Sequence, residues 1–299
     1  MPWIQLKVEV LPDQIEVIED SMLLEGAQAV TLQDGADQPI LEPELGTMPV
    51  WDKTIVIGLF DAEINGEQLI ANMQELFSCD PAMKAHLFPK HKLELVEDKD
   101  WERAWMDNFH PMQFGDRLWV CPSWKDPEDK NAVNLMLDPG LAFGTGTHPT
   151  TAHCLRFLDQ AVKGNELVVD YGCGSGILGI AALLLGSDRM LGVDNDPQAL
   201  IATRQNAERN AINADKYDVV LPENTHKVEA DIMVANILAG PLMFLAENIA
   251  KLTKSGGKLA LSGLLSHQAD EVRQAYEPWF NMDGMEQMDD WIILTGTKK

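Results

Sequence analysis

A short apolar run that passes into a glycine-rich segment and then into a helix is the feature that most constrains this fold. Residues 168–179 read Val-Val-Asp-Tyr-Gly-Cys-Gly-Ser-Gly-Ile-Leu-Gly, and residues 177–185 are apolar enough for a helix packed on a sheet. Glycine lets the backbone turn tightly against a ligand. Asp194 lies 20 residues beyond Gly174, where the next parallel strand should end and a carboxylate can accept both ribose hydroxyls. The pattern predicts a nucleoside-cofactor site in an α/β sheet.

Asp170 discriminates between the two cofactor classes that fit these glycines. The G-x-G-x-x-G pattern starting at Gly174 also occurs in dinucleotide sites, where the turn holds a pyrophosphate at a helix N-terminus. A carboxylate two residues before the first glycine would repel a pyrophosphate and attract the ammonium and sulfonium of S-adenosylmethionine. Two plainer roles stay open: Asp170 as a cap of the turn, and Asp194 as a solvated acid before a helix. The residues predicted here to bind S-adenosylmethionine are Asp170, Gly172, Gly174, Gly176 and Asp194.

Composition favours a globular chain without membrane or metal. With 299 residues and 45% hydrophobic content it can bury cores for about two domains. The N-terminus carries no basic-then-apolar signal and the longest apolar run, residues 180–185, is too short to span a bilayer, so we expect a cytoplasmic protein. The four cysteines include no C-x-x-C pair and the seven histidines no i,i+4 pair, which argues against a metal site.

The negative charge is concentrated toward the N-terminus. Residues 1–110 hold 22 acids against 7 Lys and Arg, a net charge of −15 out of −24 for the chain. Such a field repels nucleic-acid phosphates and attracts a basic partner, so we expect no direct binding of nucleic acid. Ordinary solubility is an equally good explanation of the charge taken alone.

Hydrophobic periodicity divides the first hundred residues into a βαββαβ pattern, which is the split, ferredoxin-like arrangement of an α+β domain. A polar connection of residues 34–53 separates the two halves. The predicted strands are residues 4–10, 27–32, 54–60 and 93–96, and the predicted helices are residues 15–24 and 66–77.

An aromatic segment follows this domain. Trp101, Trp105 and Phe109 recur at helical spacing, which predicts a linker helix over residues 99–115 with an apolar stripe at an interdomain seam. An aromatic cage for a methylated ammonium is the alternative. We therefore expect a ferredoxin-like domain at residues 1–98, the linker at 99–115 and a cofactor domain at 116–299.

Strands and helices alternate in the predicted cofactor domain, which indicates a doubly wound α/β sheet, Rossmann-like, with helices on both faces. The last two strands are close in sequence and predict an antiparallel terminal hairpin, as in class I methyltransferases. The predicted strands, besides the two of the cofactor site, are residues 118–121, 133–137, 230–237, 258–262, 280–284 and 291–297, with a further helix starting at Pro149.

Asn236 follows a strand predicted to neighbour the glycine strand. Ligands bind at such carboxyl ends, and a side-chain carbonyl there can accept a hydrogen bond from a substrate N–H and aim the nitrogen lone pair at a methyl group. Asn236 is therefore the predicted catalytic residue. The plainer alternative is that it caps the helix beginning near Pro241.

Three segments together carry a family resemblance: residues 138–151 (Asp-Pro-Gly-Leu-Ala-Phe-Gly-Thr-Gly-Thr-His-Pro-Thr-Thr), residues 170–176, and residues 236–241 (Asn-Ile-Leu-Ala-Gly-Pro). With Trp-Glu-Arg-Ala-Trp-Met-Asp-Asn-Phe-His-Pro at 101–111, the chain resembles over nearly its whole length the bacterial methyltransferases of protein eleven of the large ribosomal subunit.

The resemblance implies a cytoplasmic enzyme that moves methyl groups from S-adenosylmethionine to lysine side chains and the N-terminal α-amine of one basic ribosomal protein. It implies a ferredoxin-like domain that docks this substrate. It also implies cofactor contacts at Thr151, Gly172, Asp194 and Asn236, and we place Phe143 of the 138–151 loop among them.

Two rival functions stay open at this stage. One is an NAD-dependent dehydrogenase, which would need a polar proton donor near the nicotinamide. The other is a non-catalytic, ribosome-associated binding module that keeps a vestigial pocket.

Overall fold

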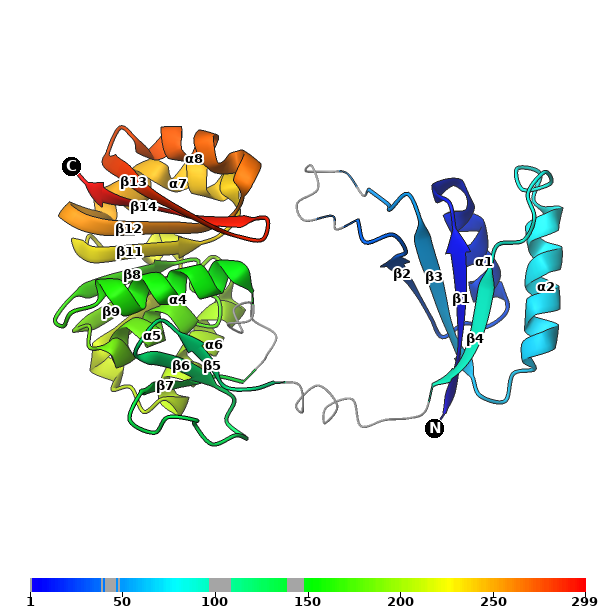
Figure 1. Ribbon diagram of the computed structural model, residues 1–299, viewed down its shortest axis with the longest axis horizontal. Coiled ribbons are helices and arrows are strands. Elements are labelled where there is room, and N and C mark those ends of the chain that lie inside the picture. Colours follow the sequence, from blue (N-terminus) through cyan, green and yellow to red (C-terminus); the bar gives the residue numbers. More distant parts are fainter. Residues whose placement is uncertain (1, 39, 41–46, 48, 97–108, 139–147) are drawn as a thin grey trace. The chain divides into compact units, whose positions relative to one another are not determined.

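The computed structural model describes residues 2–38, 40, 47, 49–96, 109–138 and 148–299. The chain divides into two compact units, an N-terminal unit of Met1–Met106 and a C-terminal unit of Asp107–Lys299 (Figure 1). The division falls inside the predicted connecting segment 99–115.

The N-terminal unit is an antiparallel sheet with two helices packed on one face. Its strand order, β2-β3-β1-β4, with the chain order βαββαβ, is the ferredoxin-like arrangement predicted from periodicity. Alternate residues of the sheet meet the apolar faces of both helices in one core, which contains Leu6, Phe60, Ile18 and Met73. The elements are β1 Trp3–Val10, α1 Ile15–Leu24, β2 Ala29–Asp34, β3 Thr54–Asp61, α2 Gly66–Cys79 and β4 His91–Val96.

The C-terminal unit is built on a seven-stranded sheet of order β10-β9-β8-β11-β12-β14-β13. The first five strands are parallel, and β14 runs antiparallel to both of its neighbours, so the predicted doubly wound sheet with a terminal hairpin is confirmed. The strands are β8 Leu167–Tyr171, β9 Arg189–Val193, β10 Tyr217–Val220, β11 Ala230–Asn236, β12 Thr253–Leu265, β13 Phe280–Met288 and β14 Trp291–Lys298.

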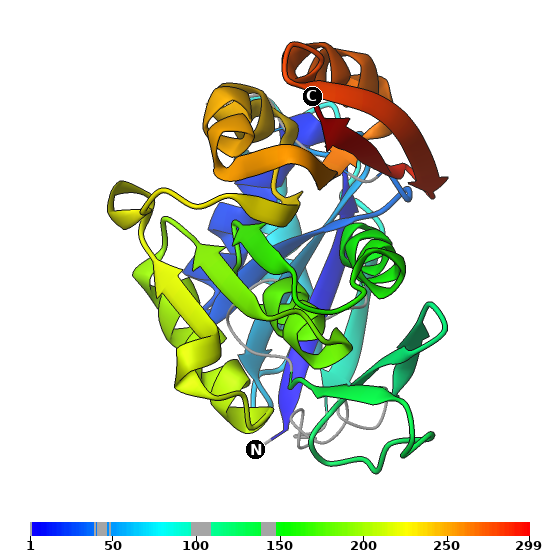
Figure 2. The ribbon, with the colours of Figure 1, turned by 90° about the vertical axis from the view of Figure 1, so that its left-hand side faces the viewer.

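Helices cover both faces of this sheet (Figures 1 and 2). Neighbouring residues of one strand enter different cores: Val168 packs with α4, α5 and α6, while Val169 packs with α7 and α8. This explains why the central strands β8, β9 and β11 are mostly apolar, because both of their faces are buried. The helices are α4 Pro149–Ala161, α5 Ile177–Leu185, α6 Pro197–Arg209, α7 Ala239–Leu252 and α8 Ala269–Tyr276.

Two predicted strands belong to a different sheet. β6 Leu118–Cys121 and β7 Val133–Met136 form a separate three-stranded sheet with β5 Met112–Phe114, instead of joining the large sheet. Only turns connect β6 to β7, whereas a doubly wound sheet needs a helix between consecutive strands. Their apolar residues cover α4 and α5 from outside. The buried Asp159 of α4 holds this layer, with its carboxylate 3.2 Å from the Arg117 guanidinium.

The prediction of a linker helix over residues 99–115 is wrong at its C-terminal end. Residues 112–114 are strand β5, because Phe114 is buried in the core and pairs with Leu118 in a hairpin. Trp101 and Trp105 lie outside the described residues. Phe109 contacts Trp124 edge-on, with ring centroids 6.5 Å apart.

No helix among the described residues is long and apolar enough to cross a membrane.

Candidate functional site

The carboxyl ends of β8, β9 and β11 meet at one edge of the large sheet, and the predicted site residues follow these strands. Ala235 of β11 pairs with Tyr171 of β8, so Asn236 and Gly172 are the next residues along adjacent strands. Asp194 follows β9, whose Val193 pairs with Tyr171. The fold therefore brings together three positions that are separated by up to 64 residues in the sequence.

The glycine turn between β8 and α5 is held from several sides. Gly172, Gly174 and Gly176 all have positive φ, at 80°, 54° and 79°. The Gly172 N–H donates to the Val193 carbonyl at 2.7 Å. From α6, the Thr203 hydroxyl donates to the Gly174 carbonyl at 3.0 Å and the Asn206 amide donates to the Ser175 carbonyl at 2.8 Å. The turn is thus shaped before any ligand binds.

Thr203 and Asn206 support the glycine turn, and the sequence did not predict them as part of the site. Both are polar side chains on the buried face of α6, with exposed fractions of 0% and 8%. Polar residues at i and i+3 on an otherwise apolar helix face are a usable signal, because buried polar groups need hydrogen-bond partners.

Asp194 holds the turn and keeps acceptor capacity. Its Oδ2 accepts from the Gly174 N–H at 2.9 Å and its Oδ1 accepts from the Asp196 N–H at 3.0 Å. A carboxylate offers about four lone-pair sites, so two are left for ligand hydroxyls. A pyrophosphate at this turn would have to displace the carboxylate from the Gly174 N–H, which argues against a dinucleotide.

Asp170 lies beneath the turn. Its side chain is fully buried, and Oδ2 accepts from the Gly179 N–H at 2.9 Å, in the first turn of α5. Holding the turn, the plainer of the two roles considered, is therefore one role that Asp170 has. Its Oδ1 has no hydrogen-bond partner among the described residues. Burial, aided by the nearby charge of Asp194, raises the pKa of Asp170 to about 7.

Asn236 does not cap the following helix. The N-cap of α7 is Leu238, and no side chain donates or accepts a capping hydrogen bond there. Instead the Asn236 amide nitrogen donates to the hydroxyl of Thr151, a fully buried residue of α4, at 3.4 Å. The Asn236 Oδ1 is buried and has no partner in the described part of the chain. An unpaired buried carbonyl at a strand end is suited to accept a hydrogen bond from a bound ligand.

The loop that leads into α4 is described only in part. Residues 139–147, which include the predicted cofactor residue Phe143, lie outside the described residues. His148 is the N-cap of α4, and its ring lies edge-on to Trp291 with centroids 4.8 Å apart.

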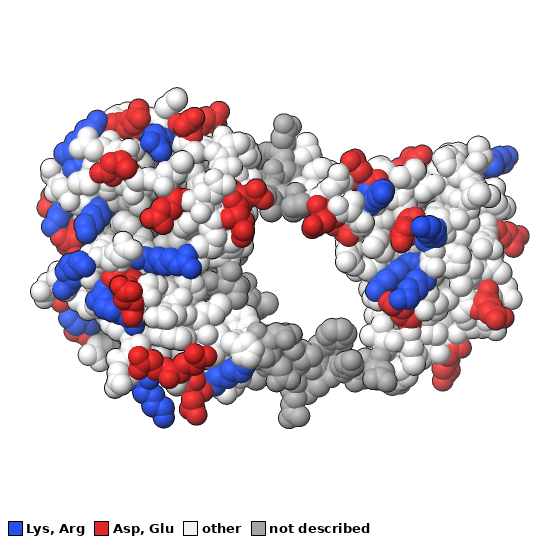
Figure 3. All heavy atoms as spheres, viewed as in Figure 1, with Lys and Arg blue, Asp and Glu red and all other residues white. Residues whose placement is uncertain are grey.

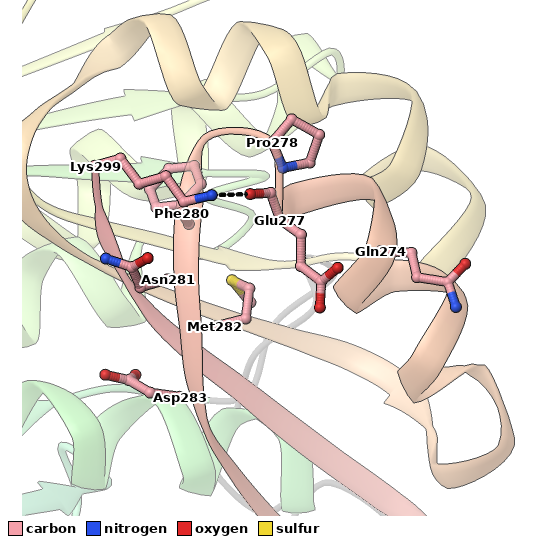
Figure 4. Close-up of a pocket in the computed structure, with 8 residues that line it drawn as sticks. All are labelled: Gln274, Glu277, Pro278, Phe280, Asn281, Met282, Asp283 and Lys299. Atoms are coloured by element: carbon pink, nitrogen blue, oxygen red, sulfur yellow. Dashed lines mark hydrogen bonds between the residues drawn. The ribbon is translucent and has the colours of Figure 1, made fainter.

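A hollow lies at the opposite edge of the sheet from the glycine turn (Figure 4). Its lining includes Phe280, where β13 begins, and Lys299, whose ammonium donates to the Glu277 carbonyl at 2.6 Å. This is the edge where the parallel strands start, away from the glycine turn. Among the described residues, no group of three or more His, Cys, Asp or Glu side chains could hold a metal ion.

Comparison with known proteins decides the family. A model of the ribosomal protein L11 methyltransferase family (PrmA) matches residues 2–299. This chain belongs to that family.

Two relatives match this chain in sequence over its full length, and a solved structure matches part of it. The ribosomal protein L11 methyltransferase of Marinobacter nauticus is 54% identical over 299 residues, covering 100% of this chain and 99% of the relative. The ribosomal protein L11 methyltransferase of Cellvibrio japonicus is 53% identical over 298 residues, covering 100% of this chain and 99% of the relative. A crystal structure of ribosomal protein L11 methylase from Lactobacillus delbrueckii subsp. bulgaricus superposes with a TM-score of 0.57 at 32% identity, covering 64% of this chain and 100% of that one.

Membership of the L11 methyltransferase family identifies the chain as an S-adenosylmethionine-dependent methyltransferase and rules against the dehydrogenase and the non-catalytic module. The site residues fit this cofactor on their own geometry. Among the described residues, Asp194 accepts only from the Gly174 and Asp196 N–H groups, which leaves lone pairs for a ribose. The assignment of single residues to cofactor contacts stays a prediction.

The buried Asp170 predicts a pH-dependent stability. Its folded pKa, about 7, lies above the ordinary 3.8, so the folded state binds the proton more tightly. The resulting stabilisation is complete below about pH 4 and is lost as pH rises to about 7. Asp170→Asn keeps an acceptor for the Gly179 N–H without the charge. We expect the unfolding midpoint of the variant to rise relative to the parent between pH 5 and pH 8, in thermal scans of the ligand-free proteins. If the difference between the two unfolding midpoints did not change with pH across this range, Asp170 would not be a buried carboxyl with a raised pKa.

Proposed function

We propose that this chain methylates lysine side chains and the N-terminal α-amine of protein L11 of the large ribosomal subunit. The observation that carries the proposal is the buried Oδ1 of Asn236, which has no partner among the described residues and lies beside the glycine turn, at the edge where ligands bind. A ribosomal substrate implies that the enzyme acts in the cytoplasm.

The chain's residues divide the reaction between them. Thr151, Gly172, Asp194 and Asn236 would hold S-adenosylmethionine, with Asp170, Gly174, Gly176 and Phe143 around it. When bound, this cofactor supplies a methyl group on a positively charged sulfur. Oδ1 of Asn236 accepts a hydrogen bond from the attacking amine and directs its lone pair along the line of displacement. Thr151 fixes the amide plane through its 3.4 Å contact with Nδ2.

Only a neutral amine can attack. At pH 7 a lysine of pKa about 10.4 is neutral in roughly one molecule of 2,500, whereas an α-amine of pKa about 8 is neutral in roughly one of ten. Desolvation beside a positive sulfur disfavours the charged amine. We therefore propose that no side chain acts as a general base and that alignment supplies most of the rate.

The helix layer of the N-terminal unit is the proposed docking surface for the basic substrate. Helices α1 and α2 contain Glu16, Glu19, Asp20, Glu67 and Glu75 and no lysine or arginine. The opposite face of the sheet is different, because Lys7 and Lys92 flank Glu94 there, at 2.7 Å and 2.6 Å. On the face shown in Figure 3, acidic and basic side chains are mixed. A helix layer without positive charge suits a lysine-rich protein and disfavours nucleic acid.

The main experiment incubates purified L11 with the enzyme and S-adenosylmethionine and maps methyl groups by mass spectrometry. We expect methyl groups on lysines and on the N-terminal amine. If L11 carries no added methyl group after prolonged incubation with a folded enzyme that binds the cofactor, the proposal is refuted.

Charge reversal tests the docking surface in the full-length chain. Replacing Glu16 and Asp20 by lysine should raise KM for L11 at least about fivefold at low salt, because two attractive charges become repulsive. The difference should shrink as salt rises, since the Debye length falls from about 10 Å at 0.1 M to about 3 Å at 1 M. Glu9→Lys, on the opposite sheet face of the same unit, is the control and should change KM less than twofold. The control changes half as much charge, so a change in log KM about half that of the double variant would mean that only the overall charge matters.

A further inference from the structure

The residue after Asn236 makes close contacts on two sides. Ile237 leaves the end of β11, and its N–H donates to the Ser262 carbonyl of β12 at 3.1 Å. Ser262 is the register partner of Asn236. The chain is therefore tied to β12 immediately beyond the predicted acceptor carbonyl.

The Ile237 side chain fills the space above Gly172. Gly172 has a φ of 80°, and a Cβ built on it would lie 2.2 Å from Ile237 Cγ2. Real carbon atoms do not approach so closely, so the methyl group occupies the place that any other residue's side chain would need. The contact joins the first glycine of the cofactor turn to the segment that carries Asn236.

The Ile237 backbone lies against a second glycine. Gly263 has a φ of 88°, and a Cβ there would lie 2.4 Å from the Ile237 carbonyl oxygen and 2.9 Å from its nitrogen. The pairing of β12 with β14 shifts register between Leu261 and Leu264, an irregularity that includes this glycine. The Ile237 backbone lies against the sheet at this irregular point.

From these contacts we propose that Ile237, seated between Gly172 and Gly263, is a positioning residue that sets the spacing between the cofactor turn and the Asn236 carbonyl. The proposal rests on the function proposed above. Methyl transfer in line requires the attacking nitrogen, the methyl carbon and the sulfur to be aligned, and a displacement of about 1 Å can cost about a hundredfold in rate. The γ-methyl of Ile237 supplies this spacing, because it is the atom that touches the turn.

A plain packing role makes a different prediction. Ile237 is half-buried and lies against the core formed with α7 and α8, so its truncation would lower stability in either case. A spacing role requires in addition that the rate depends on the γ-branch and not on the volume of the side chain. The valine variant keeps both γ-carbons, whereas the leucine variant keeps the volume and lacks the branch.

The test compares Ile237→Val, Ile237→Leu and Ile237→Ala in the full-length chain. Single-turnover methylation of L11 should stay within about twofold for valine and fall at least about tenfold for leucine and alanine. The dissociation constant of S-adenosylhomocysteine, from titration calorimetry, should change less than about threefold in all three. Folded leucine and alanine variants that react at the parental rate would overturn the spacing role, as would losses of rate matched by equal losses of affinity.

A pair of glycines in β12 provides an independent measurement. Gly263→Ala and Gly256→Ala both put a side chain at positive φ, but nothing lies within 4 Å of a Cβ at Gly256. We expect at least a tenfold loss of single-turnover rate for Gly263→Ala and less than a twofold loss for Gly256→Ala. Equal rates in the two would count against the proposal, and if Gly263→Ala does not fold, the leucine variant decides. A parental enzyme that methylates nothing overturns the proposed function and this proposal together, whereas an active parent with unaffected variants overturns this proposal alone.

Discussion

Asp194→Ala should weaken the binding of S-adenosylhomocysteine by about a hundredfold. The predicted bonds from a ribose to this carboxylate are charge-assisted and worth roughly 1.5 to 3 kcal/mol each, and the loss of two at the lower end gives about 3 kcal/mol. Each 1.4 kcal/mol is about tenfold in affinity. The measurement is titration calorimetry on the parent and the variant. A dissociation constant within threefold of the parent would remove Asp194 from the cofactor site.

The loss must be separated from damage to the turn, because Asp194 also accepts the Gly174 and Asp196 N–H groups. Asp196→Ala is a matched control. It removes the same charge from the same loop and loses the N-cap bond to the Gln198 N–H, 2.8 Å long. A lost cap costs about 1 kcal/mol of stability. We expect the control to be less stable than the parent and to bind S-adenosylhomocysteine with parental affinity.

Asn236→Ala should lower the single-turnover rate of methyl transfer by ten- to a hundredfold, with a smaller effect on cofactor affinity. The reason is that Oδ1, unpaired in the described structure, is the atom available to orient the attacking amine. One hydrogen bond to a reacting group is worth about 1.5 to 3 kcal/mol. Rapid-quench measurement with labelled cofactor and L11 gives the rate, and calorimetry gives the affinity.

Thr151→Val refines the same prediction. It keeps the shape of a buried side chain but removes the hydroxyl that accepts from the Asn236 amide at 3.4 Å. If that bond fixes the amide plane, the valine variant should lose rate in the same direction as Asn236→Ala, to a smaller extent. A parental rate in Asn236→Ala would leave the residue without a catalytic role, and a loss confined to affinity would make it a cofactor ligand alone.

Strongly periodic elements of this chain could be predicted from the sequence, and weak ones could not. The alternation of Leu6, Val8 and Val10 predicts β1, because only one face of that sheet is covered by helices. The sequence does not predict β10 at the edge of the sheet, because the exposed Asp218 interrupts its apolar run and only Val219 is buried. β6 and β7 are expected in the large sheet from the sequence, but they pair with each other and with β5, their neighbours along the chain.

The sequence by itself favoured S-adenosylmethionine over a dinucleotide and predicted the edge of the sheet at which the site lies. Glycine spacing, the acid at position 194 and Asn236 after a strand are local signals that survive without any tertiary contact. Only the tertiary structure decided what these residues touch. It placed Asp170 beneath the turn, supported the turn with Thr203 and Asn206, and seated Ile237 on two glycines. The physical reason is that burial and close packing depend on residues brought together from remote parts of the chain, which a local pattern does not specify.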